Sequence, residues 1–241
     1  MLLQVIVNGL MMGGVYVLVA VGLSMIHGVM KIVNFAQADM IMIGMYITFL
    51  MWPIVASSGI PYYLLPILCV IMFVIGVIVY KLTISHVVGK GASNYILLTC
   101  GLSYFLQYGA QLVFGPTPKA FDVNDVLRFG SLQIGSVSLP YCRIIMFGVA
   151  AVCVIIMTIV LNHTYIGLAM RATSESEQVS LSLGVNTKRI FMLAFGLATT
   201  FAGIAGLIMT PQFFAYSTLG VVFSSYATAA VVIGSLGSMP G

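Results

Sequence analysis

Charge is scarce in this chain, because Asp, Glu, Lys and Arg together make up only 6% of its 241 residues. A typical soluble domain carries about 25% charged residues. Hydrophobic residues reach 61%, and the mean hydropathy is +1.15. A soluble fold of this length would lack the polar side chains that its surface needs. The composition therefore excludes a soluble enzyme or binding domain, and we interpret residues 1–241 as a single domain embedded in lipid.

Motifs that carry chemistry are also missing. The four cysteines have no metal-ligand spacing, and they indicate no disulfide framework. HExxH and CxxC do not occur, Gly89-Lys90-Gly91 lacks the rest of a phosphate-binding loop, and no nucleophile–base pair is recognisable. No basic run is long enough to indicate nucleic acid. We therefore expect no catalytic residue, no metal ligand and no cofactor in this chain, which would not be an enzyme.

Long apolar runs are what the sequence has instead. A membrane-spanning helix needs about 20 mostly apolar residues. The candidate spans are residues 2–26, 39–55, 62–80, 95–114, 141–161 and 190–209, with a less apolar seventh at 219–236. In lipid, backbone groups must bond within their own segment, so these runs should be helices, and they are too long for barrel strands. The sequence predicts an all-α, polytopic transmembrane helical bundle with six to seven spans.

Positive charges alternate between the connections. Every second connection is basic, and these connections together hold six Lys and Arg residues. The connections between them hold only two, both in residues 115–140. We interpret residues 115–140 as a structured external loop. The six are Lys31, Lys81, Lys90, Arg171, Lys188 and Arg189; the two are Lys119 and Arg128. Cytoplasmic connections carry the excess of Lys and Arg. This pattern places residues 27–38, 81–94 and 162–189 in the cytoplasm and the N-terminus outside.

The loop at 162–189 contains the most organised polar stretch. Ser174 and Glu177 form a capping box, Glu175 adds an acid to the first turn, and Gly184 is a natural stop. These signals predict a helix of about ten residues, roughly 15 Å long. Val179 and Leu183 would share one of its faces.

This short helix has two interpretations. It is either a solvated connector on the membrane surface or a docking helix that transmits the motion of a bound partner into two spans. Its acids and serines suit a groove in a protein better than anionic lipid, which favours Lys and Arg. As a test, Glu177→Pro is expected to disrupt the helix and abolish driven uptake while leaving membrane insertion intact.

A second polar stretch interrupts the apolar runs at Asn34, Gln37 and Asp39. Asp39 leads directly into a span, where an acid at a helix N-terminus is stabilised by the helix dipole. The alternative is that the three residues belong to a broken helix beside a transport pathway, because interrupted helices often frame substrate sites and ionisable groups at membrane depth are often functional. Both interpretations of Asp39 stay open at this point.

Small residues recur at the spacing that lets helix backbones approach closely. Gly9 and Gly13 form one such pair, and Ala198, Ala202 and Gly206 form a longer series. Ordinary packing within the membrane explains such rows; the wall of a gate or pathway is the functional alternative.

Three stretches resemble the branched-chain amino acid ABC transporter permease family. Residues 22–36 (GLSMIHGVMKIVNFA) are similar to its signature after the first span, and residues 167–186 are similar to its cytoplasmic coupling loop. The glycine-rich end, GSLGSMPG at 234–241, is similar to a third family stretch. The similarity is closest to the shorter, LivH-like subunit of the permease pair and runs from the first span to the last residue.

The resemblance implies an importer for branched-chain or related amino acids in the bacterial inner membrane. Its expected partners are a second permease subunit, related or identical, two cytoplasmic ATPases that bind the ATP, an external solute-binding protein and membrane lipid. By position, the ATPase would contact the loop through Arg171, Thr173, Ser174, Glu175, Glu177, Val179, Leu183 and Gly184. Family chains usually continue through further helix, so we expect that this chain is truncated at Gly241.

The sequence also departs from the family pattern. His27 stands where an aromatic residue is frequent, Gln37-Ala38-Asp39 replaces a more usual His-Gly-Glu, and Ser176 and Ser180 occupy places where Asp and Ala are common. Urea and amide permeases share the pattern, so such a substrate stays open. Two other hypotheses remain: a proton-coupled secondary transporter or channel that uses Asp39, and a scaffold subunit without a pathway.

Overall fold

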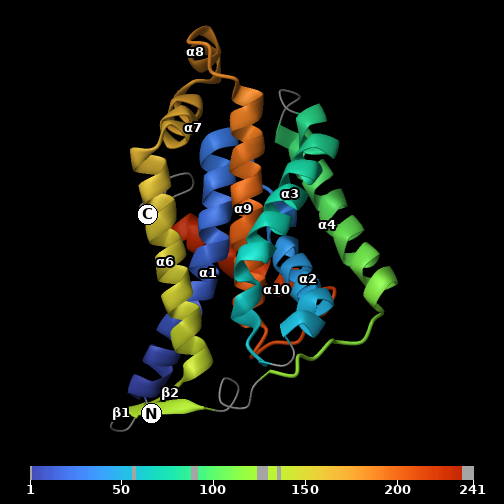
Figure 1. Ribbon diagram of the computed structural model, residues 1–241. Helices are drawn as coiled ribbons and strands as arrows, with labels where there is room; N and C mark the ends of the chain where they lie inside the picture. Colours follow the sequence, from blue (N-terminus) through green and yellow to red (C-terminus); the bar gives the residue numbers. More distant parts are fainter. Residues whose placement is uncertain (1, 56–57, 88–91, 124–129, 135–136, 235–241) are drawn as a thin grey trace.

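The computed structural model of this chain is a bundle of long apolar helices (Figure 1). It describes residues 2–55, 58–87, 92–123, 130–134 and 137–234. The long helices are α1 (Leu2–Met30), α2 (Asp39–Val55), α3 (Leu65–Leu82), α4 (Ala92–Phe114), α6 (Tyr141–His163) and α9 (Thr187–Met209). With the short turns beside them they give six segments long and apolar enough to cross a membrane. The predicted all-α bundle and its six clear spans are confirmed.

The shorter elements connect or flank these helices. They are the 3-10 turns η1 (Phe35–Gln37), η2 (Pro61–Leu64) and η3 (Ile84–His86), the strands β1 (Ser131–Ile134) and β2 (Val137–Pro140), and the helices α7 (Tyr165–Glu175), α8 (Glu177–Ser182) and α10 (Leu219–Ile233). The seventh predicted span corresponds to α10, which has 15 residues. At 1.5 Å per residue it is roughly 22 Å long, less than the roughly 30 Å hydrocarbon core.

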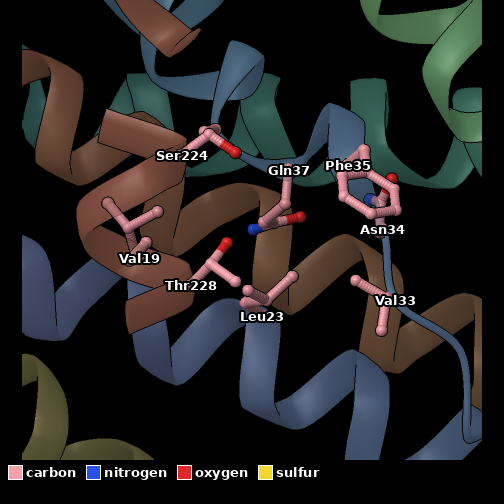
Figure 2. A pocket seen from close by; sticks show the side chains of 10 residues that line it. Val19, Leu23, Val33, Asn34, Phe35, Gln37, Ser224 and Thr228 are labelled. Atoms are coloured by element: carbon pink, nitrogen blue, oxygen red, sulfur yellow. The ribbon is translucent and has the colours of Figure 1, made fainter. Parts of the chain in front are cut away.

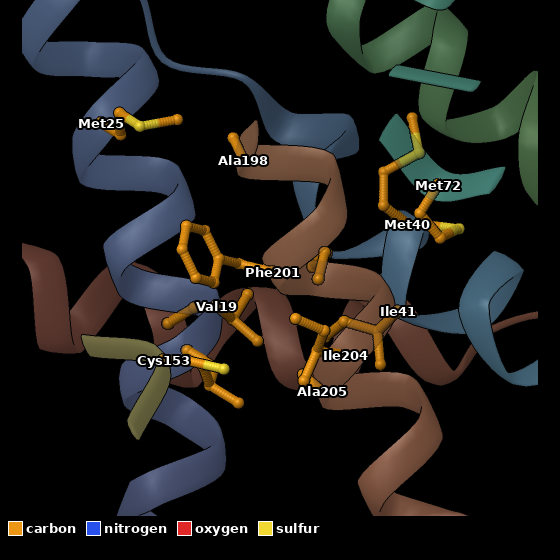
Figure 3. Close-up of a cluster of buried hydrophobic side chains, with 14 of the residues drawn as sticks. Val19, Met25, Met40, Ile41, Met72, Cys153, Ala198, Phe201, Ile204 and Ala205 are labelled. Atoms are coloured by element: carbon orange, nitrogen blue, oxygen red, sulfur yellow. The ribbon is translucent and has the colours of Figure 1, made fainter. Parts of the chain in front are cut away.

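Helix α9 is the centre of the bundle. It packs against α1, α2 and α3, and 78% of its apolar window is buried. Figure 3 shows Phe201 and Ile204 of α9 between Val19 of α1 and Ile41 of α2. Helix α6 packs on the outer side of α1, and α10 packs against α1 and α2. Every other span is therefore positioned directly or indirectly by α9.

Small residues on α9 allow its close approach to α2. A Cβ on Gly44 would lie 2.7 Å from the Cα of Gly203, and a Cβ on Gly206 would overlap the carbonyl oxygen of Ile41. The packing prediction for the α9 series is confirmed. At Gly9 and Gly13 a Cβ would meet nothing within 4 Å, so the described residues of this chain supply no close helix neighbour there, and the packing role of this pair stays a prediction.

The two ends of the bundle differ. The N-terminus and the β1–β2 hairpin lie at one end, and α7 and α8 extend from the other (Figure 1). The basic connections after α1 and α3 lie at the α7–α8 end. Arg143, in the first turn of α6, adds a positive charge at the opposite end, and the count by connections did not include it. Lys90, Arg128 and residues 235–241 lie outside the described residues.

The loop at 115–140 is structured where it is described. The hairpin is tied to α1 through Gln4, whose side chain donates to the Ser138 carbonyl at 2.5 Å and accepts from the Ser138 N–H at 2.8 Å. Lys119 and Ala215 exchange a pair of backbone hydrogen bonds at 2.8 and 3.0 Å. The loop is thereby joined to the α9–α10 connection.

Candidate functional site

The break between α1 and α2 lies inside the bundle. Helix α1 ends at Met30, followed by Lys31 with a left-handed φ of 56°. The chain then turns inward, so that Asn34 and Gln37 are each only 1% exposed. This confirms an interrupted, buried polar stretch at these residues; that they form part of a transport pathway stays a prediction.

Backbone contacts fix how both amides are oriented. Asn34 caps η1 by accepting from the Ala36 N–H at 3.1 Å through Oδ1. Gln37 donates through Nε2 to the Ala198 carbonyl of α9 at 2.8 Å. Gly22 permits this contact, because a Cβ there would lie 2.8 Å from Nε2. The atoms that remain, Asn34 Nδ2 and Gln37 Oε1, are buried and have no hydrogen-bond partner among the described residues.

A small pocket adjoins these amides (Figure 2). Figure 2 shows Gln37 between the hydroxyls of Ser224 and Thr228, which come from α10, and Asn34. Val19 and Leu23 of α1 form an apolar wall. The cavity has a volume of about 10 Å³, close to the minimum for one water molecule. Helix α1, the break and α10 therefore meet around a small space with both polar and apolar walls.

Asp39 belongs to a different cluster. It is 2% exposed, and its carboxylate accepts from Ser103 Oγ at 2.5 Å and from Gln107 Nε2 at 2.9 Å, both on α4. Gln107 also donates to Ser103 at 3.0 Å. Gly220, in the first turn of α10, packs so closely that a Cβ would lie 2.8 Å from the Asp39 Cα. The carboxylate thus joins three helices.

These contacts give Asp39 a structural explanation. Its oxygens are occupied by hydrogen-bond donors, and it lies at the N-terminus of α2, where the helix dipole favours an anion. Asp39→Ala would leave Ser103 and Gln107 without their acceptor, so we expect the free energy of unfolding to fall by about 2 kcal/mol. The melting temperature of detergent-solubilised protein measures this loss.

Asp122→Ala is the matched control, because that carboxylate is exposed and its removal should leave the melting temperature unchanged. Asp39→Asn keeps the shape and an acceptor oxygen, so the uptake that the family resemblance implies should persist in this variant. Loss of uptake in Asp39→Asn at full thermal stability would contradict the structural role and support proton coupling.

The sequence did not single out the residues that complete these two clusters. They are Ser103, Gln107, Ser224, Thr228 and Gly220. Ser103 with Gln107 and Ser224 with Thr228 are each four residues apart in otherwise apolar helices, so each pair lies on one face. That spacing is a signal that could have identified them.

The loop at 162–189 differs from its predicted form. Helix α7 continues through Ser174, whose hydroxyl donates to the Arg171 carbonyl at 2.7 Å and caps nothing. The chain becomes extended at Ser176, which caps α8 by accepting from the Val179 N–H at 3.3 Å. The predicted capping box is therefore wrong, and the ten-residue helix is a six-residue one. The stop at Gly184 is confirmed by its φ of 83°.

The predicted coupling residues lie mostly on the surface of this loop. Val179 is 58% and Leu183 76% exposed. Arg171, Glu175, Glu177 and Gly184 are exposed, Ser174 is half-buried, and Thr173 is buried, donating to the Ala169 carbonyl at 2.7 Å. Thr173 is thus unable to form an external contact in this conformation. The others lie on α7, on α8 or directly after α8, outside the spans.

An all-helical bundle with six segments long and apolar enough to cross a membrane is the architecture of an integral membrane protein. The sequence matches the family described as "Branched-chain amino acid transport system / permease component" over residues 5–241. The chain belongs to this family and is a membrane-spanning transport subunit.

Curated relatives cover nearly the whole chain. It is 29% identical to the high-affinity branched-chain amino acid transport system permease protein BraD of Pseudomonas aeruginosa, over 99% of this chain and 81% of the relative. It is 28% identical to the permease proteins LivH of Salmonella typhimurium and Escherichia coli, each over 99% of this chain and 80% of the relative. No solved structure matches significantly.

Proposed function

We propose that this chain is one of two membrane subunits of an ABC importer that carries branched-chain or related amino acids across the bacterial cytoplasmic membrane. The observation that carries the proposal is the match of the chain over residues 5–241 to the permease family. The names of the relatives supply the substrate class. The polar break at Asn34 and Gln37, buried among apolar helices, is the proposed pathway.

The different character of the two ends of the bundle supports a proposed place for each partner. Two ATPases bind the exposed α7–α8 surface and hold the ATP, and a solute-binding protein delivers the amino acid at the end formed by the N-terminus, the hairpin and the loop around Lys119. Lys31, Lys81, Arg171, Lys188 and Arg189 belong to the α7–α8 end. Since cytoplasmic loops are rich in Lys and Arg, that end is cytoplasmic and the N-terminus is outside.

Reconstitution tests this function directly. The chain, its partner permease and candidate ATPases are placed in vesicles with a candidate binding protein, and uptake of labelled leucine is measured. We expect uptake that requires ATP and the binding protein, with competition by isoleucine and valine. Uptake that proceeds without the ATPases would contradict the importer. Competition by urea but not by valine would instead assign the urea or amide alternative.

A further inference from the structure

The pocket beside the helix break has a defined hydrogen-bonding polarity. Asn34 Oδ1 accepts from a backbone N–H, and Gln37 Nε2 donates to a backbone carbonyl, so within the described part of the chain the atoms left without any bond are a donor on Asn34, Nδ2, and an acceptor on Gln37, Oε1. Both free atoms are buried without a partner among the described residues. Buried polar atoms in native proteins nearly always have a hydrogen-bond partner. Two such atoms without a partner beside one pocket therefore indicate a ligand that accepts from Asn34 Nδ2 and donates to Gln37 Oε1.

The remaining walls restrict the ligand further. Ser224 and Thr228 add hydroxyls that donate or accept, and Val19, Leu23 and Ala227 add aliphatic surface. Among the residues that the structure describes around the pocket, none is charged. A ligand with a net charge would be desolvated there without a counter-charge, at high cost. The pocket therefore suits a molecule with no net charge, one acceptor end, one donor end and an aliphatic part.

We propose that Asn34, Gln37, Ser224 and Thr228 form a transient binding site for the backbone of a zwitterionic α-amino acid. Asn34 Nδ2 donates to the carboxylate, and Gln37 Oε1 accepts from the ammonium group. The α10 hydroxyls complete the contacts, and Val19 and Leu23 receive the aliphatic side chain. Neutral groups bind a zwitterion weakly enough for release, as a transport pathway requires. This inference rests on the proposed function.

The site must open before a substrate enters. The pocket of about 10 Å³ admits no amino acid in this conformation. Its polar walls come from two separate parts of the chain, the break and α10. Separation of α10 from the break would therefore enlarge the pocket. In the described conformation Ser224 and Thr228 lie beside Gln37 (Figure 2).

Asn34→Asp is the sharpest test. Asp retains the Oδ1 acceptor that caps η1, so the local fold is preserved, but it replaces the free donor by a negatively charged oxygen. In the reconstituted complex we expect leucine uptake to fall about tenfold or more, because the variant loses at least one hydrogen bond to the carboxylate of the substrate. Because Asn34→Asp also buries a carboxylate without a counter-charge, its melting temperature is expected to fall. Stimulation of the ATPase by loaded binding protein should persist in Asn34→Asp, and Thr228→Val, which adds no charge, should keep the thermal stability of the wild type.

Helix α10 offers a matched pair of variants. Thr228→Val removes a hydroxyl that lines the pocket, while the volume of the side chain stays nearly the same. We expect this variant to slow uptake several-fold. Ser225→Ala removes a neighbouring hydroxyl that is exposed and bonded to the Val221 carbonyl, so uptake should not change. Excess urea or acetamide should leave leucine uptake unchanged.

The outcomes separate the two proposals. Wild-type vesicles without ATP-dependent uptake would overturn the proposed function. Active wild-type vesicles with equal uptake by Asn34→Asp and Thr228→Val would overturn only this site. A joint loss of uptake, ATPase stimulation and thermal stability would show a structural role and also overturn it. Inhibition by urea or acetamide that disappears in Asn34→Asp would assign the pocket to a neutral amide instead of a zwitterion.

Discussion

Gly206→Ala is expected to lower the free energy of unfolding by about 3 kcal/mol, the upper range for overpacking a tight interior. The added methyl group would overlap the Ile41 carbonyl oxygen and approach the Met45 nitrogen to 3.0 Å. Both are backbone atoms of α2, so no side-chain rotation relieves the overlap. Helices α2 and α9 would have to separate at the centre of the bundle, where α9 also contacts α1 and α3.

Gly109→Ala is the control for Gly206→Ala. Gly109 lies within α4, and a Cβ there would meet nothing within 4 Å. Since alanine is the better helix former, Gly109→Ala should be neutral or slightly stabilising. The melting temperature and the size-exclusion profile in detergent measure both variants. Equal melting temperatures for the two would show that the close contact between α2 and α9 is absent.

The double variant Val179→Glu/Leu183→Glu is expected to reduce ATP-driven uptake to background. The two side chains are exposed apolar groups four residues apart at the α7–α8 end of the bundle. If the proposed ATPase covers these positions, each introduced Glu carboxylate would be buried at the interface without a counter-charge. The free energy of burying these charges would exceed the binding free energy that the apolar contact contributes. Co-purification of the ATPase and vesicle uptake are the measurements, and unfolding of the permease is not expected because both positions are on the surface.

Gln178→Glu/Ser182→Glu supplies the matched control for this surface. It adds the same charge at the same spacing, on a neighbouring face of α8 that is already polar and exposed. Uptake in this variant should stay within a few-fold of wild type. Equal loss in both double variants would indicate a general effect of charge and remove the support for an apolar contact.

The structure also changes which substitution disrupts α8. Glu177→Pro, suggested by the sequence, falls on the first helical residue, after an extended Ser176 with φ of −152° and ψ of 115°. Proline is tolerated at that position, and the residue before it favours extended backbone. Glu177→Pro is therefore expected to preserve the helix, whereas Ser180→Pro would remove the bond from its N–H to the Ser176 carbonyl.

The sequence alone determined the spans, because hydrocarbon thickness requires a length of apolar chain that is a local property. It also determined the stop at Gly184, where the left-handed conformation favours glycine. The sequence alone could not decide whether Ser174 or Ser176 is the N-cap of the short helix. Both are good caps, and the structure shows α7 running through Ser174 and breaking at Ser176.

Only the tertiary structure decided the roles of the polar residues at the break. Asp39 and Ser103 are 64 residues apart in the sequence, and Gln37 and Ala198 are 161 apart. Whether a buried amide or carboxylate is satisfied depends on such distant partners, which local sequence cannot reveal. The chain showed that Asn34, Gln37 and Asp39 are polar and interrupt the apolar runs. The packing of α4, α9 and α10 around them gave each Asp39 oxygen a hydrogen bond and left Asn34 Nδ2 and Gln37 Oε1 without a partner among the described residues.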